Sequence, residues 1–304
     1  MLKINIHNEI SPLKAVVLGT AVQNGPTPKP EDCYDPKSLE NVLAGTYPLE
    51  EDMVEELEGV AKVFEKYGVK VFRPEVLKDC NQIFARDIAF VIEDKFIQSN
   101  ILPDRDKEIH AIDHVIELID SDNVIALPEE AHVEGGDVMP WGEYIFVGIY
   151  SGKDYPEYIT ARSNMDAVIA LQELFPDKMV KSFELIKSNT NPKQNALHLD
   201  CCFQPIGKGK AIMNPDGFLV ESEYEFLVEL FGKDNIFEIT NEEMYHMFSN
   251  VFSISEDVII SEKSFTRLNT WLKGQGFTVE EVQFSEISKQ GGLLRCATLP
   301  LFRV

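Results

Sequence analysis

Short segments rich in β-branched residues alternate with helical patterns along the whole chain, and this alternation restricts the fold more than any other feature. In Pro48–Tyr67, apolar residues recur every three to four positions from Met53 to Phe64, as they do on one face of a helix. Such alternation predicts an α/β fold built from strand and helix units. The other expected helices are Met165–Leu174, Glu221–Phe231 and Glu262–Gly274, and the expected strands are Lys14–Leu18, Val69–Phe72, Ala89–Ile92, Asn123–Ala126, Tyr144–Val147, Ala211–Asn214 and Asp257–Ile260.

The alternation continues without a linker-like stretch, so we treat residues 1–304 as a single catalytic domain. The most loop-like part is Asn24–Thr46, which contains four prolines, and we expect it to form a surface loop or a lid. A helix followed by a short strand recurs most clearly at Gly68–Val71 and Gly276–Val279. Two matches of this length are weak evidence for internal repeats when taken alone.

The composition excludes several classes of function. The formal net charge of −23 repels phosphate backbones, so we expect no nucleic-acid partner and a mild attraction for cationic small molecules. The first residues lack the basic and apolar regions of a signal peptide, and no run approaches the ~18 apolar residues of a membrane helix. We therefore expect a cytoplasmic protein that has no membrane contact.

The five cysteines show neither a disulfide framework nor a zinc site. Their number is odd, and no C-x-x-C spacing occurs among them. A disulfide between the adjacent Cys201 and Cys202 would be strained. This cysteine pattern indicates a reducing compartment, in which most of the thiols are buried structural residues.

Ionisable residues gather beside glycines or strand starts in four places. Arg86 and Asp87 lie where a turn meets an apolar strand, although charged groups at a strand end are commonly a solvated rim. The four segments are C-N-Q-I-F-A-R-D-I-A-F-V-I (Cys80–Ile92), A-H-V-E-G-G-D-V-M-P-W-G (Ala131–Gly142), N-A-L-H-L-D-C-C-F (Asn195–Phe203) and G-G-L-L-R-C (Gly291–Cys296).

The second and third segments each bring a pair of polar groups together. Glu134 and Asp137 bracket two glycines, which allow close backbone approach or positive φ; the plainer interpretation is a tight acidic turn. His198 and Asp200 are two residues apart and would share one face of a strand. A lone histidine is more often a satisfied core residue than a catalyst, so these pairs leave both interpretations open.

The fourth segment places Cys296 after two glycines and beside Arg295. A neighbouring cation favours the thiolate, whereas the plainer interpretation is a buried structural thiol. A thiol, an imidazole and a carboxylate form a recurrent arrangement for nucleophilic catalysis. The excess of carboxylates in the four segments favours a cationic electrophile, and a planar guanidinium matches carboxylates bidentately.

The order of these segments resembles the guanidino-group-modifying enzymes of the pentein superfamily: arginine deiminases, dimethylarginine dimethylaminohydrolases and amidinotransferases. The resemblance spans nearly the whole chain. It implies a five-bladed, pseudo-symmetric α/β propeller of ββαβ-like units with a central active site. The motifs that carry it are N-E-I-S-P-L-K-A-V-V-L-G (Asn8–Gly19), F-A-R-D (Phe84–Asp87), V-E-G-G-D (Val133–Asp137), L-H-L-D (Leu197–Asp200) and G-G-L-L-R-C (Gly291–Cys296).

The resemblance also implies roles for individual residues. Cys296 falls at the position of the nucleophile, His198 at that of the general acid and base, and Glu134 at the acidic position of the triad. Asp87 and Asp200 fall at positions that hold the guanidinium.

Three further residues have less specific matches. Asp137 is expected to orient its neighbours, and Arg162, in T-A-R-S-N, resembles an arginine that binds a substrate carboxylate. Arg105 is a weaker candidate for the same task. The chemistry implied by the family needs neither a metal nor an organic cofactor.

The sequence leaves the second half of the reaction open. With water as acceptor, the protein is a hydrolase that acts on arginine or a substituted arginine through an amidino-cysteine intermediate. We favour this hypothesis. With an amine as acceptor it is an amidinotransferase, and a non-catalytic pentein binding protein is a third alternative. We expect a small cationic guanidino substrate as partner, and the oligomeric state, a homodimer among the options, stays open.

Overall fold

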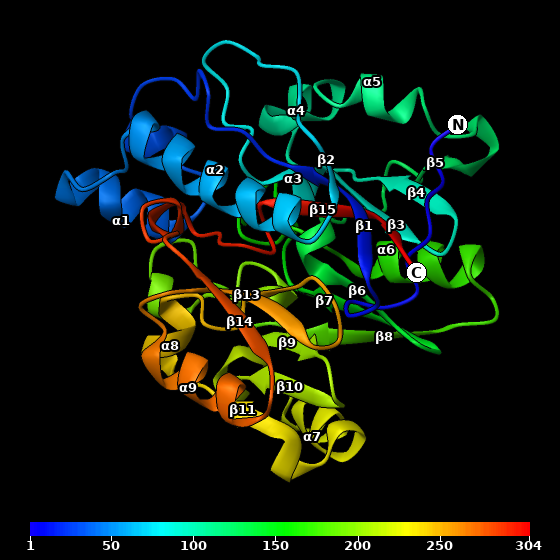
Figure 1. The fold of residues 1–304 in the computed structure, drawn as a ribbon. Coiled ribbons are helices and arrows are strands. Elements are labelled where there is room, and N and C mark those ends of the chain that lie inside the picture. The colour runs from blue at the N-terminus through cyan, green and yellow to red at the C-terminus, as the bar shows by residue number, and fades with distance from the viewer.

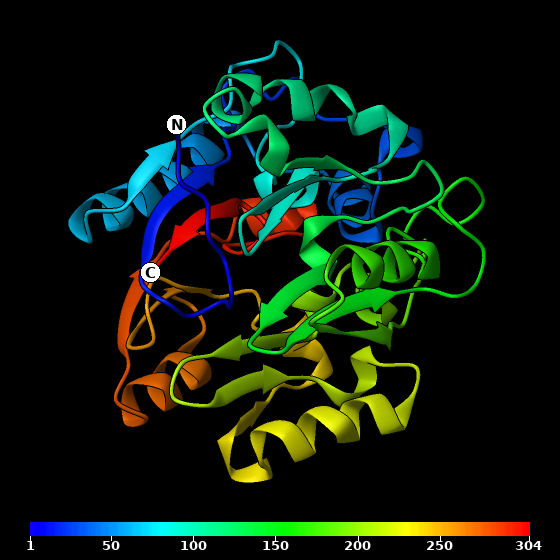
Figure 2. The same ribbon diagram turned by 90° about the vertical axis from the view of Figure 1, so that its right-hand side faces the viewer.

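The computed structural model describes all 304 residues, and its strands form five separate three-stranded sheets arranged around a common centre (Figures 1 and 2). In each sheet, two antiparallel strands are followed by a third strand parallel to the middle one. This repeated order confirms the five-bladed α/β propeller of ββαβ-like units. The sheets are β15 (Thr298–Arg303), β1 (Leu13–Leu18) and β2 (Lys70–Phe72); β3 (Ala89–Ile92), β4 (Lys95–Gln98) and β5 (Val124–Ala126); β6 (Val138–Trp141), β7 (Tyr144–Ile149) and β8 (Met179–Glu184); β9 (Phe203–Ile206), β10 (Lys210–Met213) and β11 (Ile236–Glu238); and β12 (Phe252–Ser253), β13 (Val258–Glu262) and β14 (Thr278–Val282).

Helices connect the middle strand of each sheet to its parallel neighbour, because parallel strands need a crossover connection. These helices lie on the outside of the ring (Figures 1 and 2). No helix has the length and hydropathy needed to cross a bilayer. The crossover helices are α2 (Glu50–Lys66), α4 (Lys107–His110) with α5 (Asp113–Ile116), α6 (Met165–Leu174), α7 (Glu221–Phe231) and α9 (Thr266–Gly274), and the remaining helices are α1 (Pro36–Ala44), α3 (Ala85–Ile88) and α8 (Asn241–Tyr245).

The first sheet closes the ring with strands from opposite ends of the chain. Strand β15 pairs antiparallel with β1, with Leu18 opposite Thr298 and Leu13 opposite Arg303 (Figure 1). The last strand therefore takes the place that β3, β6, β9 and β12 take in the other sheets. Cys296 lies two residues before β15, so the ring closure brings it to the centre of the molecule.

All the expected helices and strands are present, and most of their bounds agree with the structure within about two residues; the largest difference is at the start of Glu262–Gly274. Helix α9 begins at Thr266 because Glu262 still pairs with Val282 in β13 and β14. The strand Ala89–Ile92 has its expected bounds and follows the short helix α3, which ends at Ile88. The segment 24–46 contains the helix α1, whose first turn is capped by the Asp35 carboxylate accepting from two backbone amides.

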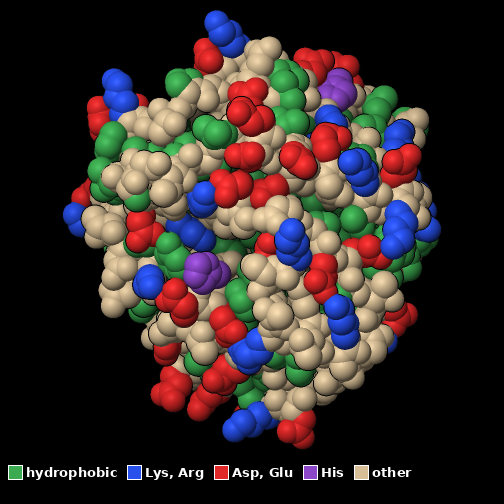
Figure 3. Space-filling view, turned by 60° about the vertical axis from the view of Figure 1, so that its left-hand side comes forward, with side chains coloured by type: hydrophobic (Ala, Val, Ile, Leu, Met, Phe, Trp, Pro, Cys, Tyr) green, Lys and Arg blue, Asp and Glu red, His purple; other side chains and the backbone are tan.

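The surface carries the charge that the composition indicates. On the face in Figure 3, Asp and Glu side chains are dispersed among Lys and Arg side chains, and several gather in its upper half.

Candidate active site

A cavity of about 210 Å³ opens where the starts of the inner strands converge. Asp87, His198 and Cys296 line it together, although they are far apart in the sequence and belong to different sheets. The segment 24–46 supplies much of the remaining wall, from Asn24 to Ser38. With Arg162, four of the seven residues that were predicted for the site line this cavity, and the loop-like segment forms part of the same wall.

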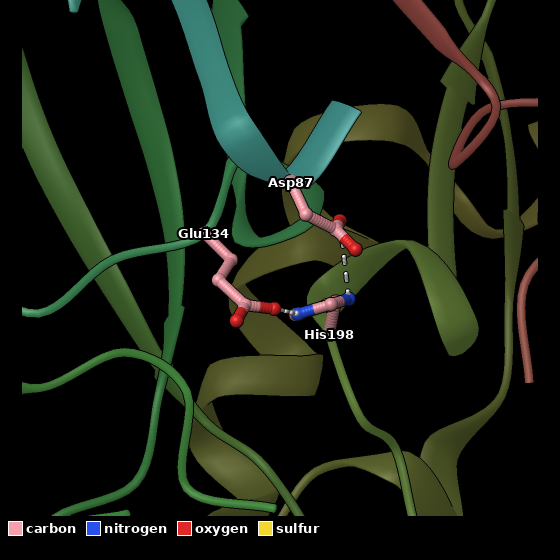
Figure 4. Close-up of side chains that lie close together, drawn as sticks. All are labelled: Asp87, Glu134 and His198. Atoms are coloured by element: carbon pink, nitrogen blue, oxygen red, sulfur yellow. Dashed lines mark hydrogen bonds and ion pairs between the residues drawn. The ribbon is translucent and has the colours of Figure 1, made fainter. Parts of the chain in front are cut away.

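His198 lies between two carboxylates from neighbouring units (Figure 4). Its Nε2 is 2.7 Å from Oε2 of Glu134, and its Nδ1 is 3.8 Å from Oδ1 of Asp87. Burial lowers the pKa of His198, but the charge of Asp87 and the hydrogen bond to Glu134 outweigh burial and raise it to about 9. The imidazole is therefore protonated at neutral pH and can donate a proton to a leaving group.

Asp87, Glu134 and His198 are close enough to hold a metal ion, since one ligand atom from each lies within 4.8 Å of the others. Two arginines already neutralise this cluster: Arg105 Nη1 is 3.0 Å from Asp87 Oδ2, and Arg162 Nη1 is 2.9 Å from Glu134 Oε2. A divalent cation would meet both guanidinium groups. The arrangement suits acid–base chemistry better than metal binding.

Arg162 is bound to the protein by all three guanidinium nitrogens. Its Nη1 donates to both carboxylate oxygens of Glu134, its Nε to the carbonyl of Ile159 and its Nη2 to the carbonyl of Tyr34. Burial raises the pKa of Glu134, but Arg162 and His198 outweigh it, and the pKa stays well below its ordinary value. This geometry positions Glu134 and does not support the expectation that Arg162 binds a substrate carboxylate.

Asp87 has one oxygen free inside the cavity wall. Oδ2 accepts a hydrogen bond from Arg105, whereas the buried Oδ1 has no hydrogen-bond partner. His198 Nδ1 lies at the ion-pair distance of 3.8 Å from this oxygen, which leaves the oxygen without a hydrogen bond that an N–H donor from a ligand would supply. This arrangement fits the expected role of Asp87 in holding a guanidinium.

The Cys296 thiol is buried among polar groups. Asn250 Nδ2 lies 3.2 Å from Sγ, and Asp200 Oδ2 lies 3.6 Å from it. Burial and the charges of Asp200 and Asp87 raise the pKa of the thiol well above its ordinary value. The cavity without substrate therefore holds a protonated thiol.

The neighbouring Arg295 does not stabilise the thiolate as expected. Its guanidinium pairs with Asp200 at 2.9 Å and with Glu9 at 3.2 Å, and it also donates to the carbonyls of Gly136 and Val138. The guanidinium makes no direct contact with the sulfur, and reaches it only through Oδ2 of Asp200, which lies 3.6 Å from Sγ. Arg295 is a structural residue that ties the start of the chain to two units of the ring.

The expectation that His198 and Asp200 share the face of a strand was wrong. His198 immediately precedes the 3-10 turn Leu199–Cys201, and β9 begins only at Phe203. The turn sends His198 toward Glu134, while Asp200 reaches Arg295 and the thiol without lining the cavity.

Asp137 and Asn250 hold the backbone around the reactive groups. Asp137 accepts a hydrogen bond from the Leu199 amide at 2.8 Å and from the Ser163 hydroxyl at 2.6 Å, which fits its expected orienting role. Oδ1 of Asn250 accepts from the amide nitrogens of Arg295 and Cys296. The sequence reasoning missed Asn250; its signal is its place two residues before β12, which matches Cys296 before β15.

Gly136 makes room for the imidazole. A Cβ at this position would lie 2.6 Å from Nδ1 of His198, whereas a Cβ at Gly59 on helix α2 would meet nothing within 4 Å. We expect Gly136→Ala to displace the ring from Glu134 and to lower the pKa of His198 from about 9 toward its ordinary value, because the stabilising carboxylate contact is lost. An NMR titration of the imidazole measures this shift. Gly59→Ala should leave it unchanged, and an equal pKa in both variants would contradict the argument.

Comparison with known proteins identifies the chain's relatives. The family model described as N,N dimethylarginine dimethylhydrolase, eukaryotic, matches residues 47–303. Uncharacterized protein YkgA from Bacillus subtilis (strain 168) is 29% identical over 223 residues, which are 73% of this chain and 70% of that protein.

Solved structures of similar fold cover almost the whole chain. SxtG, an amidinotransferase of the saxitoxin biosynthetic pathway from Microseira wollei, matches with a TM-score of 0.76 and 20% identity over 99% of this chain and 97% of its own. The N-terminal domain of ArgZ, an arginine dihydrolase of the ornithine–ammonia cycle in Cyanobacteria, matches with a TM-score of 0.77 and 19% identity over 95% of this chain and 97% of its own. These likenesses agree with the five-bladed fold.

Proposed function

Because the chain belongs to the N,N dimethylarginine dimethylhydrolase family, we propose that it is a cysteine-dependent hydrolase that acts on the guanidinium group of arginine or a related guanidine. One observation carries the proposal: the Cys296 thiol, the protonated His198 and Asp87, one oxygen of which accepts no hydrogen bond, line the same cavity. A thiol nucleophile, a proton donor and a guanidinium acceptor are the groups that this reaction needs. Residues 1–304 act as one catalytic domain, and the partner is a small cationic guanidino compound.

The reaction begins when the cationic substrate enters. Its guanidinium donates a hydrogen bond to the free oxygen of Asp87, and its charge lowers the pKa of the Cys296 thiol, which loses its proton to solvent. The thiolate adds to the central carbon of the guanidinium. Asp200 lies beside the sulfur but does not line the cavity, so it acts on the thiol rather than on the guanidinium.

His198 then moves two protons. The imidazolium, hydrogen-bonded to Glu134, donates its proton to the departing nitrogen, the C–N bond breaks, and an amidino-cysteine cation remains on Sγ. The neutral imidazole deprotonates a water molecule, which adds to the same carbon. The C–S bond breaks as the added hydroxyl passes its proton to the departing sulfur, which restores the Cys296 thiol and releases a ureido product. Every step uses only side chains, substrate and water.

The segment 24–46 has a defined place in this mechanism. Its residues line the cavity, and the carbonyl of Tyr34 accepts a hydrogen bond from Arg162, which also holds Glu134. The segment acts as a lid that closes over the bound substrate and excludes bulk water.

An amidinotransferase is the second candidate. The structure of SxtG, which is named an amidinotransferase, covers 99% of this chain, so the fold suits both reactions. In that case an amine replaces water in the second step, and His198 deprotonates it. A non-catalytic binding protein is less consistent with the site, because it would not need the thiol, imidazole and carboxylate together.

The test is to incubate the protein with arginine, methylated arginines, N-acyl-arginine and 4-guanidinobutylamine, with and without glycine or ornithine. A hydrolase releases ammonia or an alkylamine and forms a ureido product without an added amine. Product formation that depends on the added amine identifies a transferase. A protein that turns over none of these guanidines under either condition would contradict both candidates.

A further inference from the structure

Cys296 has a counterpart at the same place in each other unit of the ring. The inner strands β3, β6, β9, β12 and β15 each begin two residues after one of these positions, which hold Asp87, Gly136, Cys201, Asn250 and Cys296. Asn250 lies outside the cavity wall, but its side chain contacts the sulfur directly. It is therefore a buried group in contact with a reacting atom, and the reaction steps assign it no task.

Two buried side chains hold the backbone around Cys296. Oδ1 of Asn250 accepts hydrogen bonds from the amide nitrogens of Arg295 at 2.9 Å and of Cys296 at 3.2 Å. Arg86 donates its own amide to the Cys296 carbonyl at 3.0 Å and its Nε to the Arg295 carbonyl at 3.4 Å. Because Oδ1 accepts from two N–H donors, the amide of Asn250 has a fixed orientation, in which Nδ2 faces the sulfur.

The polar side chains in contact with the sulfur are an N–H donor and a carboxylate. Nδ2 of Asn250 lies 3.2 Å from Sγ of Cys296, whereas Oδ2 and Oδ1 of Asp200 lie at 3.6 and 3.9 Å. In the resting thiol, S–H donates to Asp200 while the sulfur accepts from Asn250. Once the thiol loses its proton, the contact with Asp200 becomes repulsive, whereas the N–H contact becomes a stronger, charge-assisted hydrogen bond.

The other groups around the sulfur mostly oppose a negative charge there. Burial, the carboxylates of Asp200 and Asp87 and the thiol of Cys201 all raise the pKa of the Cys296 thiol. The backbone of Leu293 acts in the opposite direction. A thiolate at this place therefore depends on the N–H donors that it can reach.

From these contacts we propose that Asn250 is a catalytic residue that stabilises the Cys296 thiolate through a hydrogen bond from Nδ2 to Sγ. The inference rests on the proposed function and adds one group to its mechanism. The bond strengthens when the thiol loses its proton, and again when the C–S bond of the amidino adduct breaks and negative charge returns to the sulfur. The two backbone hydrogen bonds to Oδ1 keep Nδ2 in place for both steps.

The variant Asn250→Asp separates the donor from the backbone contacts. Its carboxylate still accepts from both backbone amides, which also favour its ionised form, but it presents an oxygen to the sulfur in place of an N–H. The rate of alkylation by iodoacetamide at about pH 9 reports the thiolate fraction, because the thiolate is the reactive form. We expect alkylation of Cys296, followed by mass spectrometry, to be about tenfold slower or more, and kcat on the best guanidine to fall at least as far.

Asn269→Asp is the matched control, since Asn269 is also buried but lies on the outer helix α9, where it donates to the Glu262 carbonyl. It should keep the wild-type alkylation rate. Asn250→Ala, which adds no charge, should also slow the alkylation, and it carries the test if Asn250→Asp does not fold. A wild-type rate in either folded Asn250 variant would overturn the donor role. The alkylation needs no guanidine, so this result is independent of whether the proposed function holds.

Discussion

Cys296→Ser is expected to reduce the turnover of every guanidino substrate by a factor of about 10³ or more, because loss of the nucleophile removes the covalent path. Serine preserves the size of the side chain and its hydrogen bond from Asn250, so the fold should be unchanged. Its hydroxyl is far less acidic than a thiol, and nothing in the site deprotonates it. Steady-state kinetics on the best substrate, with thermal unfolding of both proteins, measures the two effects separately.

Cys80→Ser is the matched control, since Cys80 is buried but does not line the cavity. It should retain wild-type kcat/KM. Mass spectrometry of the wild-type protein quenched during turnover should find the amidino adduct on Cys296. Full activity of Cys296→Ser, or an adduct on another residue, would disprove the assignment of the nucleophile.

The positions of most elements could be predicted because their causes are local. Apolar periodicity predicted both ends of α6 and α7, and the β-branched run predicted both ends of β3. Periodicity could not show that five sheets close into one ring, because closure depends on the pairing of β1 with β15 across the whole length of the chain. The resemblance to the pentein superfamily supplied that part.

The chemistry of the site was harder to predict, since partners distant in the sequence decide the role of each charge. Arg295 was expected to act on the adjacent thiol, but Glu9 and Asp200 take its guanidinium. Glu108 belongs to none of the motifs, and its two hydrogen bonds from the Arg105 guanidinium are visible only in the structure. Asn250 carries no charge, so only its position before an inner strand marks it. In each case the fold decides which groups the residue contacts, and neighbours in the sequence do not reveal those contacts.

Deletion of residues 297–304 is expected to prevent stable folding, because it removes the strand that closes the ring. Leu299 and Leu301 are fully buried, and their loss costs about 1.5–3 kcal/mol each in apolar burial. The deletion also unpairs one edge of β1 and leaves the carbonyls of Ser11 and Ser253 without Arg303, at about 1–3 kcal/mol for each buried group. Together these losses approach the ~5–15 kcal/mol that stabilises a typical domain.

Graded variants separate ring closure from a general sensitivity of this end of the chain. Removal of Val304 alone, whose side chain is largely exposed, should leave the free energy of unfolding nearly unchanged. Leu301→Ala keeps the strand but opens a cavity, and we expect it to lower that free energy by about 2–5 kcal/mol. Chemical denaturation measures both variants, and circular dichroism with limited proteolysis reports on the deletion. A deletion protein that unfolds cooperatively at the wild-type midpoint would show that β15 is dispensable. The ring would then be held by the other four sheets, and the central position of Cys296 would need another explanation.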